Sequence, residues 1–367
     1  MLIEALRDIA ESRGLDVLVL SAPDNIEYFT GVPTIGDAVL LMIYDKRQGT
    51  ASLYVPLLEY QRYRDMVPPH VDVYAVSRTL KPPHIPIADL DWKDIIARYR
   101  NVEKIGADIS HVSPLQGTVQ ATLEGKVIDV SNDIWKVRMI KSNRELESIK
   151  EATKVTLKGI LAIYSELREG VTETALTGVF EKTVRDHGVE RAAFDPIIAF
   201  KPNNAYPHTL PGNRGLSSRD LVLVDVGVKV GGRCSDVTRM ILWGRPSREE
   251  RRGIEAVVEA LETAIDAIKP GIRAGEVYET AVKVLENYGL REKFIHGLGH
   301  GIGIVVHEPP YLRRQSDTVL EPGMVFTVEP GVYFPGKYGI RVEEVVLVTK
   351  KGAHVLSKRL EKVLQSL

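Results

Sequence analysis

The chain of 367 residues has little of three features that would each point to a particular class of protein. A single cysteine, Cys234, excludes an intramolecular disulfide and favours a reducing compartment. Apolar runs are short: one of the longest, residues 38–44, is far below the roughly 20 residues that a membrane span needs. Charged residues interrupt the first turns of the chain, so no secretory signal is expected. The sequence therefore predicts a soluble, cytoplasmic protein without a membrane partner.

An excess of charge is also missing. Lys and Arg together number 48 and Asp and Glu 49, which gives a net charge of −1. Without a basic surplus there is no general electrostatic reason to bind nucleic acid or an anionic membrane. Hydrophobic residues make up 44% and charged residues 26%, as in ordinary globular proteins. The length predicts two or three domains.

The first domain is expected over residues 1–135 and reads as α/β. Its pattern predicts an opening amphipathic helix, then a loop at 21–31 and a proline-rich loop at 81–86. Strands are expected at 16–20, 38–44, 51–55, 71–76 and 126–130. The sequence pattern changes near residues 135–142. A long helix is predicted directly after them, at 143–167, with charged residues at its start and an apolar stripe along it. A second domain is therefore expected over residues 143–367.

The second domain contains a candidate internal repeat. Gly170-Val171 and Gly271-Ile272 each precede an amphipathic helix, and these helices end at Gly188 and Gly289. The offset is the same at both ends, because 271 − 170 and 289 − 188 are both 101. Two similar α/β halves around a shared sheet would explain this spacing. A site between such halves would take one set of side chains from each.

Two aspartates occupy unusual positions in the first half. Asp225 lies inside the apolar strand predicted at 221–230, where an isolated carboxylate is costly. Asp236 lies in the next predicted strand, 234–242. A turn centred on residues 230 and 231 would place the two aspartates directly opposite each other. A turn centred on 231 and 232 would leave them diagonal on the same face. Either arrangement is unfavourable unless a cation lies between them.

The second half shows the same feature with glutamates. Glu329 ends one predicted strand and Glu343 begins another, and a hairpin centred on Gly336 would place both on one face, together with Arg341. Nearby, the run FIHGLGHGIGIVVHE contains His296, His300 and His307. Its glycines argue against a helix and favour close approach of the backbone.

Four carboxylates and one imidazole form an oxygen-rich ligand set that suits two divalent cations bridged by carboxylates. Such a pair lowers the pKa of a bound water and favours hydrolysis of a carbonyl compound. Taken singly, each acid could instead be a solvated strand end or half of a buried salt bridge. A cysteine hydrolase is less favoured, because a small cysteine usually packs in a core. No Walker A string and no G-x-S-x-G elbow is present.

The motifs LVLVDVG, CSDVTR, HGLGHGIGIVVHE, FTVEPGVY and GIRVEE follow one another in this order. With them, the chain resembles the proline-specific pita-bread (creatinase-type) metallopeptidases, namely the Xaa-Pro dipeptidases (prolidases) and aminopeptidases P, over nearly its whole length. The resemblance implies an α+β fold. A C-terminal pita-bread domain would have pseudo-twofold α/β halves around a curved, mainly antiparallel sheet. A smaller creatinase-like α/β domain would precede it and limit entry to short peptides.

The same resemblance implies a role for each candidate residue and two divalent metal ions per subunit (Mn, Co, Zn or Fe). The implied metal ligands are Asp225, Asp236, His300, Glu329 and Glu343. Asp236 and Glu343 would bridge the ions, and Glu329 would also act as general base at a metal-bridging hydroxide. His208 and His307 would bind substrate and stabilise the oxyanion. Residues His296, Tyr333 and Arg341 would lie beside the ligands and the substrate. The family also implies a homodimer.

The expected activity is hydrolysis of Xaa-Pro dipeptides. An aminopeptidase P that acts on longer peptides is the alternative, and a non-catalytic binding protein or a metal-independent amidinohydrolase of the same fold is more remote. Some prolidases carry an arginine four residues after the position of His307, where it is thought to hold the substrate's C-terminal carboxylate. Here that position is Tyr311, with Arg313 and Arg314 close by. The modest length favours the dipeptidase.

Overall fold

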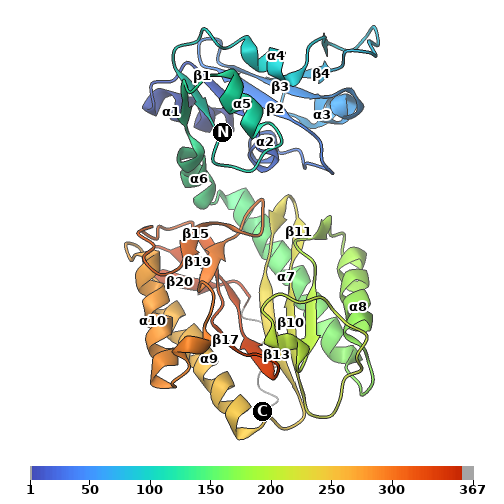
Figure 1. Cartoon of the computed structure of the whole chain (residues 1–367), viewed down its shortest axis with the longest axis vertical. Coiled ribbons are helices and arrows are strands. Elements are labelled where there is room, and N and C mark those ends of the chain that lie inside the picture. The colour runs from blue at the N-terminus through green and yellow to red at the C-terminus, as the bar shows by residue number, and fades with distance from the viewer. Residues whose placement is uncertain (1, 358–367) are drawn as a thin grey trace. The chain divides into compact units, whose positions relative to one another are not determined.

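The computed structural model describes residues 2–357. The chain divides into two compact units, Met1–Arg138 and Met139–Leu367 (Figure 1).

The N-terminal unit is built on one mixed sheet of seven strands in the order β5-β4-β3-β2-β1-β6-β7. Strand β2 pairs antiparallel with β1 and β3, and the outer pairings are parallel. The strands are β1 (Val17–Leu20), β2 (Leu41–Asp45), β3 (Thr50–Pro56), β4 (Val71–Val76), β5 (Ile87–Ala88), β6 (Ile105–Ala107) and β7 (Val127–Asp129). The helices are α1 (Leu2–Ser12), α2 (Pro23–Thr30), α3 (Tyr60–Met66), α4 (Trp92–Ala97), α5 (Gln116–Thr122) and α6 (Ser131–Met139).

The loop predicted at residues 21–31 is wrong, because most of it forms helix α2. Pro23 is the first residue of the helix, where its missing N–H removes no hydrogen bond within the helix. Gly31 ends the helix in the left-handed conformation (φ 72°), and its N–H donates to the carbonyl of Glu27. Ile26 and Phe29 are fully buried on one side of the helix. Proline at the start and glycine just past the end are helix boundary signals that outweigh the loop-like composition.

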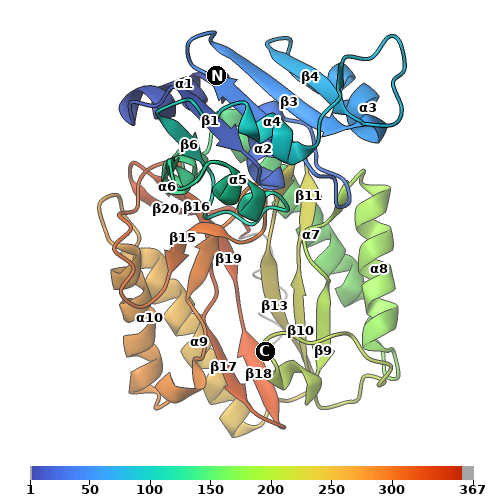
Figure 2. The same ribbon diagram turned by 45° about the horizontal axis from the view of Figure 1, so that its top comes forward.

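The C-terminal unit consists of two halves that each begin with a pair of helices. The first half has α7 (Asn143–Glu166), α8 (Glu173–Asp186), β8 (Arg191–Ala192), β9 (Ile197–Phe200), β10 (Asp220–Val226), β11 (Val228–Val230), β12 (Arg233–Cys234) and β13 (Val237–Trp243). The second half has α9 (Arg248–Ala267), α10 (Ala274–Asn287), β14 (Gly299–Gly301), β15 (Glu308–Leu312), β16 (Val325–Val328), β17 (Gly331–Phe334), β18 (Tyr338–Arg341), β19 (Glu344–Thr349) and β20 (Gly352–Val355). All strand pairings in the described part of this unit are antiparallel. Figures 1 and 2 show the helix pairs α7/α8 and α9/α10 on opposite sides of this unit, with the strands between them.

The predicted internal repeat is present. Helices α8 and α10 have the same length of 14 residues and are separated by the expected offset, since 274 − 173 and 287 − 186 are both 101. The turns before them also match. The N–H of Gly170 donates to Leu216 and that of Gly271 to Leu320, both at 2.9 Å. Each helix pair packs on its own hydrophobic cluster, and both clusters combine strand residues from the two halves. The fold is thus the predicted α+β arrangement with a mainly antiparallel C-terminal core.

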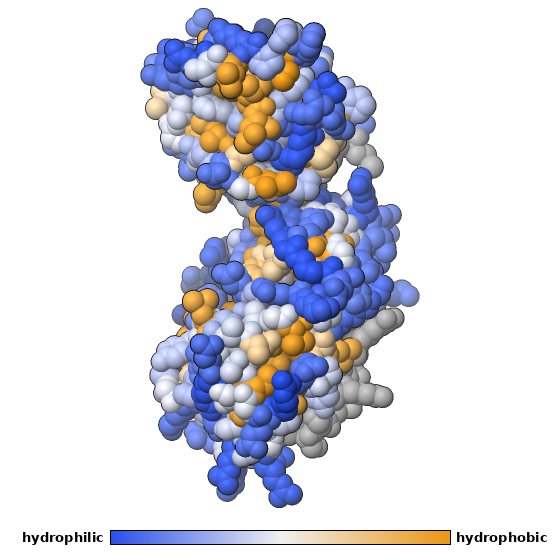
Figure 3. All heavy atoms as spheres, turned by 90° about the vertical axis from the view of Figure 1, so that its right-hand side faces the viewer, coloured by the Kyte–Doolittle hydropathy of each residue, from blue (hydrophilic) through white to orange (hydrophobic). Residues whose placement is uncertain are grey.

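No helix among residues 2–357 is both long enough and apolar enough to cross a bilayer. Figure 3 shows hydrophobic side chains on the drawn face in small patches between polar ones.

The packing of α7 on α8 gives a stability test. A Cβ placed on Gly159 of α7 would lie 2.5 Å from a ring carbon of the buried Phe180, whereas a Cβ on the exposed Gly178 of α8 would meet nothing within 4 Å. We expect Gly159→Ala to lower the free energy of unfolding by about 1–3 kcal/mol through overpacking. The matched change Gly178→Ala should raise it by up to about 1 kcal/mol, because alanine favours the helix. Urea unfolding of both variants, followed by circular dichroism, checks these signs. An unchanged or stabilised Gly159→Ala variant would contradict the packing.

Candidate metal centre

The C-terminal unit contains a cavity of about 880 Å³ that draws its lining from both halves. Nine of the ten predicted site residues line it: His208, Asp225, Asp236, His296, His300, His307, Glu329, Arg341 and Glu343. The tenth, Tyr333, contacts two of these through its hydroxyl group. The structure therefore brings together side chains that are up to 135 positions apart in the sequence, since 343 − 208 is 135.

The register of β10 and β13 decides between the two turns that the sequence allowed. Asp225 pairs with Thr238, so the turn is centred on Gly231 and Gly232 and the aspartates are diagonal. Both glycines have positive φ, 56° and 72°, as a tight hairpin turn of this type requires. Between the strands, a Cβ on Gly227 would lie 2.1 Å from the carbonyl oxygen of Ser235, so glycine is needed there. This close approach brings the backbone next to Asp236 toward the end of β10.

The glutamates lie where a hairpin centred on Gly336 places them. Strands β17 and β18 pair Gly331 with Arg341, and β16 and β19 pair Val328 with Glu344. Both ladders keep the same register, so Glu329 and Glu343, which lie between the ladders, are opposite each other. Opposite residues in an antiparallel pair are close neighbours on one face.

Ligand atoms of these residues form three overlapping groups, each with all its atoms within 4.8 Å of one another. The groups are Asp225/Asp236/Glu343, His300/Glu329/Glu343 and Asp236/His300/His307. Glu343 belongs to two groups that together contain all five predicted ligands. One oxygen of Asp225 and one of Asp236 are buried without a hydrogen-bond partner in the described residues. Such oxygens are costly unless a cation binds them, so the donor set fits divalent ions.

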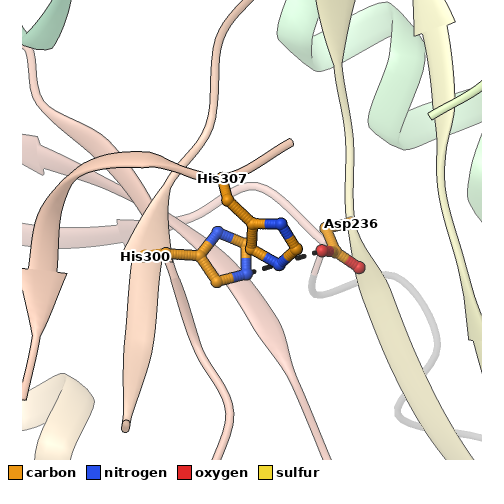
Figure 4. Close-up of side chains that lie close together, drawn as sticks. All are labelled: Asp236, His300 and His307. Atoms are coloured by element: carbon orange, nitrogen blue, oxygen red, sulfur yellow. Dashed lines mark ion pairs between the residues drawn. The ribbon is translucent and has the colours of Figure 1, made fainter. Parts of the chain in front are cut away.

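His300 is oriented so that one ring nitrogen faces the acids. Its Nδ1 lies 3.2 Å from the carbonyl oxygen of Gly301, which can only accept, so Nδ1 carries a proton. Its Nε2 is 3.3 Å from Glu329 and 3.6 Å from Asp236. Figure 4 shows the rings of His300 and His307 beside the Asp236 carboxylate. A backbone hydrogen bond of this kind is how proteins fix the tautomer of a metal-binding histidine.

The acids affect one another's ionisation strongly. Burial, followed by the charges of Glu343, Asp225 and Glu329, raises the pKa of Asp236 well above its usual value. Burial and the charge of Glu329 likewise raise the pKa of Glu343 to about 8. Burial also opposes ionisation of Glu329, but the hydrogen bond and charge of His300 lower the pKa of Glu329 to about 2. Burial and mutual repulsion thus disfavour the charged forms of Asp236 and Glu343, and a nearby cation would favour them.

Arg341 connects Asp225 to Tyr333 and to the backbone beside His208. Its guanidinium is buried and forms an ion pair with one oxygen of Asp225. It also donates to the hydroxyl of Tyr333 at 2.6 Å and to the carbonyl of Pro207, next to His208, at 3.3 Å. The reading of the acids as buried salt bridges therefore applies to Asp225 alone. The described residues place no Lys or Arg in ion-pair contact with Asp236, Glu329 or Glu343.

The remaining histidines lie around the cavity. His296 is within 3.2 Å of the Tyr333 hydroxyl through Nε2, and its Nδ1 is 2.7 Å from the carbonyl of Gly297. The centroid of the His307 ring lies 4.2 Å from that of His300. Burial and the charge of His300 lower the pKa of His307 to about 4, so that its ring is neutral near pH 7.

Sequence reasoning missed two buried threonines that contact the ligand candidates. Thr238 donates a hydrogen bond to Glu343 at 2.8 Å, and Thr327 donates one to Glu329 at 3.2 Å. Thr327 also accepts the backbone N–H of His300. Thr238 lies two residues after Asp236 and Thr327 two residues before Glu329, so strand alternation could have placed them on the ligand face.

Both units match known protein families. Residues 147–350 match the model of metallopeptidase family M24, and residues 3–140 match the Creatinase/Prolidase N-terminal domain.

Three relatives are similar to this chain over nearly its whole length. The chain is 32% identical over 360 residues to a Xaa-Pro dipeptidase of Pyrococcus furiosus, with 97% of each chain covered. The structure of a prolidase from Pyrococcus horikoshii has a TM-score of 0.86 at 29% identity and covers 97% of this chain and 98% of its own. An X-Pro aminopeptidase from Thermotoga maritima has a TM-score of 0.84 at 27% identity, with 97% of both chains covered. These matches show that the chain belongs to metallopeptidase family M24 and joins that family's catalytic domain to a creatinase/prolidase N-terminal domain.

Proposed function

We propose that this metallopeptidase is a Xaa-Pro dipeptidase that holds two divalent metal ions through Asp225, Asp236, His300, Glu329 and Glu343. The observation that carries the proposal is the overlap of the ligand groups at Glu343. One group is purely carboxylate and the other contains the imidazole, so Glu343 would be a ligand common to both positions. The oxygen-rich set accepts Mn, Co, Zn or Fe.

Bound divalent ions would lower the pKa of a shared water and so supply the nucleophile for peptide hydrolysis. The side chains of the chain itself supply the other functions. Glu329, with a pKa of about 2 before metal binds, is ionised near neutral pH and can accept a proton. His307, neutral at that pH, and His208 can each donate an N–H to the carbonyl oxygen of the scissile bond. Arg341 keeps Asp225 and the backbone beside His208 in fixed positions.

The cavity wall offers groups that suit a short peptide ending in proline. Phe194, Ile197 and Leu210 provide apolar surface for a pyrrolidine ring. Arg313 also lines the cavity, with its guanidinium carbon 5.5 Å from the centroid of the Tyr311 ring. The part of the chain that the structure describes places no carboxylate in ion-pair contact with Arg313. A dipeptide brings a free carboxylate that this cation can bind, which favours the dipeptidase over an aminopeptidase P.

The proposal includes two further features, a homodimer and a reducing, cytoplasmic location. The second is supported by the single free cysteine, Cys234, which is buried. Light scattering of the purified chain tests the first, and fractionation of the source cells tests the second.

The first prediction concerns metal content. We expect elemental analysis of the protein, purified without chelator and reloaded with Mn, to give two ions per chain. Glu343→Gln, which removes charge from both ligand groups, should retain less than one ion. Glu344→Gln is the matched control, because the neighbouring Glu344 forms an ion pair with Arg239. It should retain two. Chelation should abolish cleavage of Met-Pro and metal should restore it. Equal metal content in both variants, or cleavage unaffected by EDTA, would contradict the proposal.

The second prediction concerns pH and the metal-free protein. Folded Glu343 keeps its proton up to about pH 8, whereas the unfolded chain releases it near 4.5. Between these values the folded state binds more protons, so stability must fall as the pH rises. The raised pKa values of Asp236 and His300 act in the same direction, whereas the lowered pKa values of His296 and His307 act the opposite way below about pH 6.5. We expect the metal-free protein to unfold more easily at pH 8 than at pH 5, by up to a few kcal/mol. The metal should stabilise more at pH 8.

Urea unfolding with and without metal measures this dependence. Glu343→Gln should flatten the pH profile of the metal-free protein, because glutamine does not ionise. A profile that rises from pH 5 to pH 8 would show that the acids are not crowded as described.

The third prediction concerns Arg313. Arg313→Gln should raise KM for Met-Pro about tenfold, because a hydrogen bond to a charged group contributes about 1.5 kcal/mol or more. Cleavage of Met-prolinamide, which lacks the carboxylate, should change less than about twofold. Arg314→Gln is the neighbouring control and should leave both substrates unaffected. An equal loss on both substrates would argue against carboxylate binding. Faster cleavage of Met-Pro-Xaa than of Met-Pro by the unchanged protein would favour the aminopeptidase.

A further inference from the structure

A buried ion pair lies beside the loop that ends at His307. Lys141 donates to the carboxylate of Glu308, and both side chains are only 1% exposed. Lys141 directly precedes Ser142, the N-cap of α7. Glu308 is the first residue of β15 and directly follows His307. The pair thus joins the start of the C-terminal unit to the strand next to a proposed substrate-binding histidine.

The loop between β14 and β15 is folded around the Glu308 carboxylate. A Cβ on Gly303 would lie 2.2 Å from one oxygen of this carboxylate and 2.8 Å from the other, so the backbone touches the acid directly. At the base of the loop, Gly301 pairs with Glu308 at a break in the β14–β15 register. The far side of the loop is held by the N–H of Cys234, which donates to the carbonyl of Gly303 at 2.8 Å. The carboxylate therefore sets the path of the backbone.

His307 has little support of its own. Its ring has no hydrogen-bond partner among the side chains and backbone groups that the structure describes, and the residue is exposed toward the cavity. The position of the ring is consequently set by its backbone and by the contact with His300. A donor that stabilises developing charge must be held close to its working position, and an error of 1 Å can cost about 100-fold in rate.

A purely stabilising role is the simpler reading of such a pair, but it is weakly supported. Burying two charges is costly, and a well-packed hydrophobic pair is often as stable or more stable. The placement directly behind His307 gives the ions a reason to be there. We propose that Lys141 and Glu308 are positioning residues that hold His307 at the reacting peptide bond. The role of His307 rests on the proposed function, whereas the positioning itself does not.

Crystal structures of Glu308→Gln and Lys141→Met test the positioning without any assay. We expect the His307 ring and residues 302–307 to move by about 1 Å or more, while the carboxylates of Asp225 and Glu343 stay in place. If either single variant fails to fold, the double variant Lys141→Met/Glu308→Leu replaces it, because it removes both charges of the pair together. An unmoved His307 in these structures would overturn the proposal, even for a protein that cleaves no Xaa-Pro peptide.

Kinetics of Met-Pro cleavage test whether the pair acts through His307. Glu308→Gln should lower kcat about 10–100-fold with little change in KM. In a His307→Ala background the same change should cost less than about twofold, because the residue to be positioned is gone. Asp220→Asn is the control. Asp220 is buried and held by Arg214, but it does not line the cavity. Its loss should lower stability and leave kcat unchanged.

The outcomes are separable. If Glu308→Gln lowers kcat as strongly in the His307→Ala background as in the otherwise unchanged protein, the pair has a general structural role and the positioning proposal is overturned. An unchanged protein that cleaves neither Met-Pro nor longer Xaa-Pro peptides with Mn, Co or Zn present would end the proposed function. The crystal structures would then still decide whether Lys141 and Glu308 set the position of His307.

Discussion

Four carboxylates share one buried space in the C-terminal unit, and their mutual repulsion is the constraint on which the rest of the site depends. Asp225, Asp236, Glu329 and Glu343 come from two hairpins that belong to different halves of the repeat. Arg341 forms an ion pair only with the first, and His300 comes within ion-pair distance only of the second and third. Burial and the neighbouring negative charges raise the pKa values of Asp236 and Glu343. Divalent ions bound as proposed would remove this penalty, and the folded chain already brings their candidate ligands together.

The duplicated architecture explains why such a crowded site can form. Each helix pair packs on its own hydrophobic cluster, and each cluster also includes strand residues of the other half, so the two halves form one hydrophobic scaffold around the acids. The hairpins then meet with their ligand faces toward each other. Arg341 links Asp225, from the first half, to Tyr333 of the second, and two threonines hold the glutamates. A stable scaffold therefore carries the electrostatic cost of the site, as metal and catalytic centres require.

Much of the site was readable from the sequence because strand geometry is regular. Alternation and hairpin symmetry predicted that Glu329 and Glu343 share a face, and they reduced the relation of Asp225 and Asp236 to two registers. The structure was needed to choose the diagonal register, because both turns contain glycine. The contact of Glu308 with Gly303 was not predictable, since it depends on how an irregular loop folds. Helix α2 was missed because its boundary signals, Pro23 and Gly31, also suit a loop.

The most direct test of the central claim is a crystal structure of the Mn-loaded protein with anomalous diffraction measured near the Mn absorption edge. We expect two anomalous peaks about 3.5–4 Å apart, enclosed by Asp225, Asp236, His300, Glu329 and Glu343. A single peak, peaks at other side chains, or a site in which Arg341 has turned to neutralise all four acids would contradict this expectation.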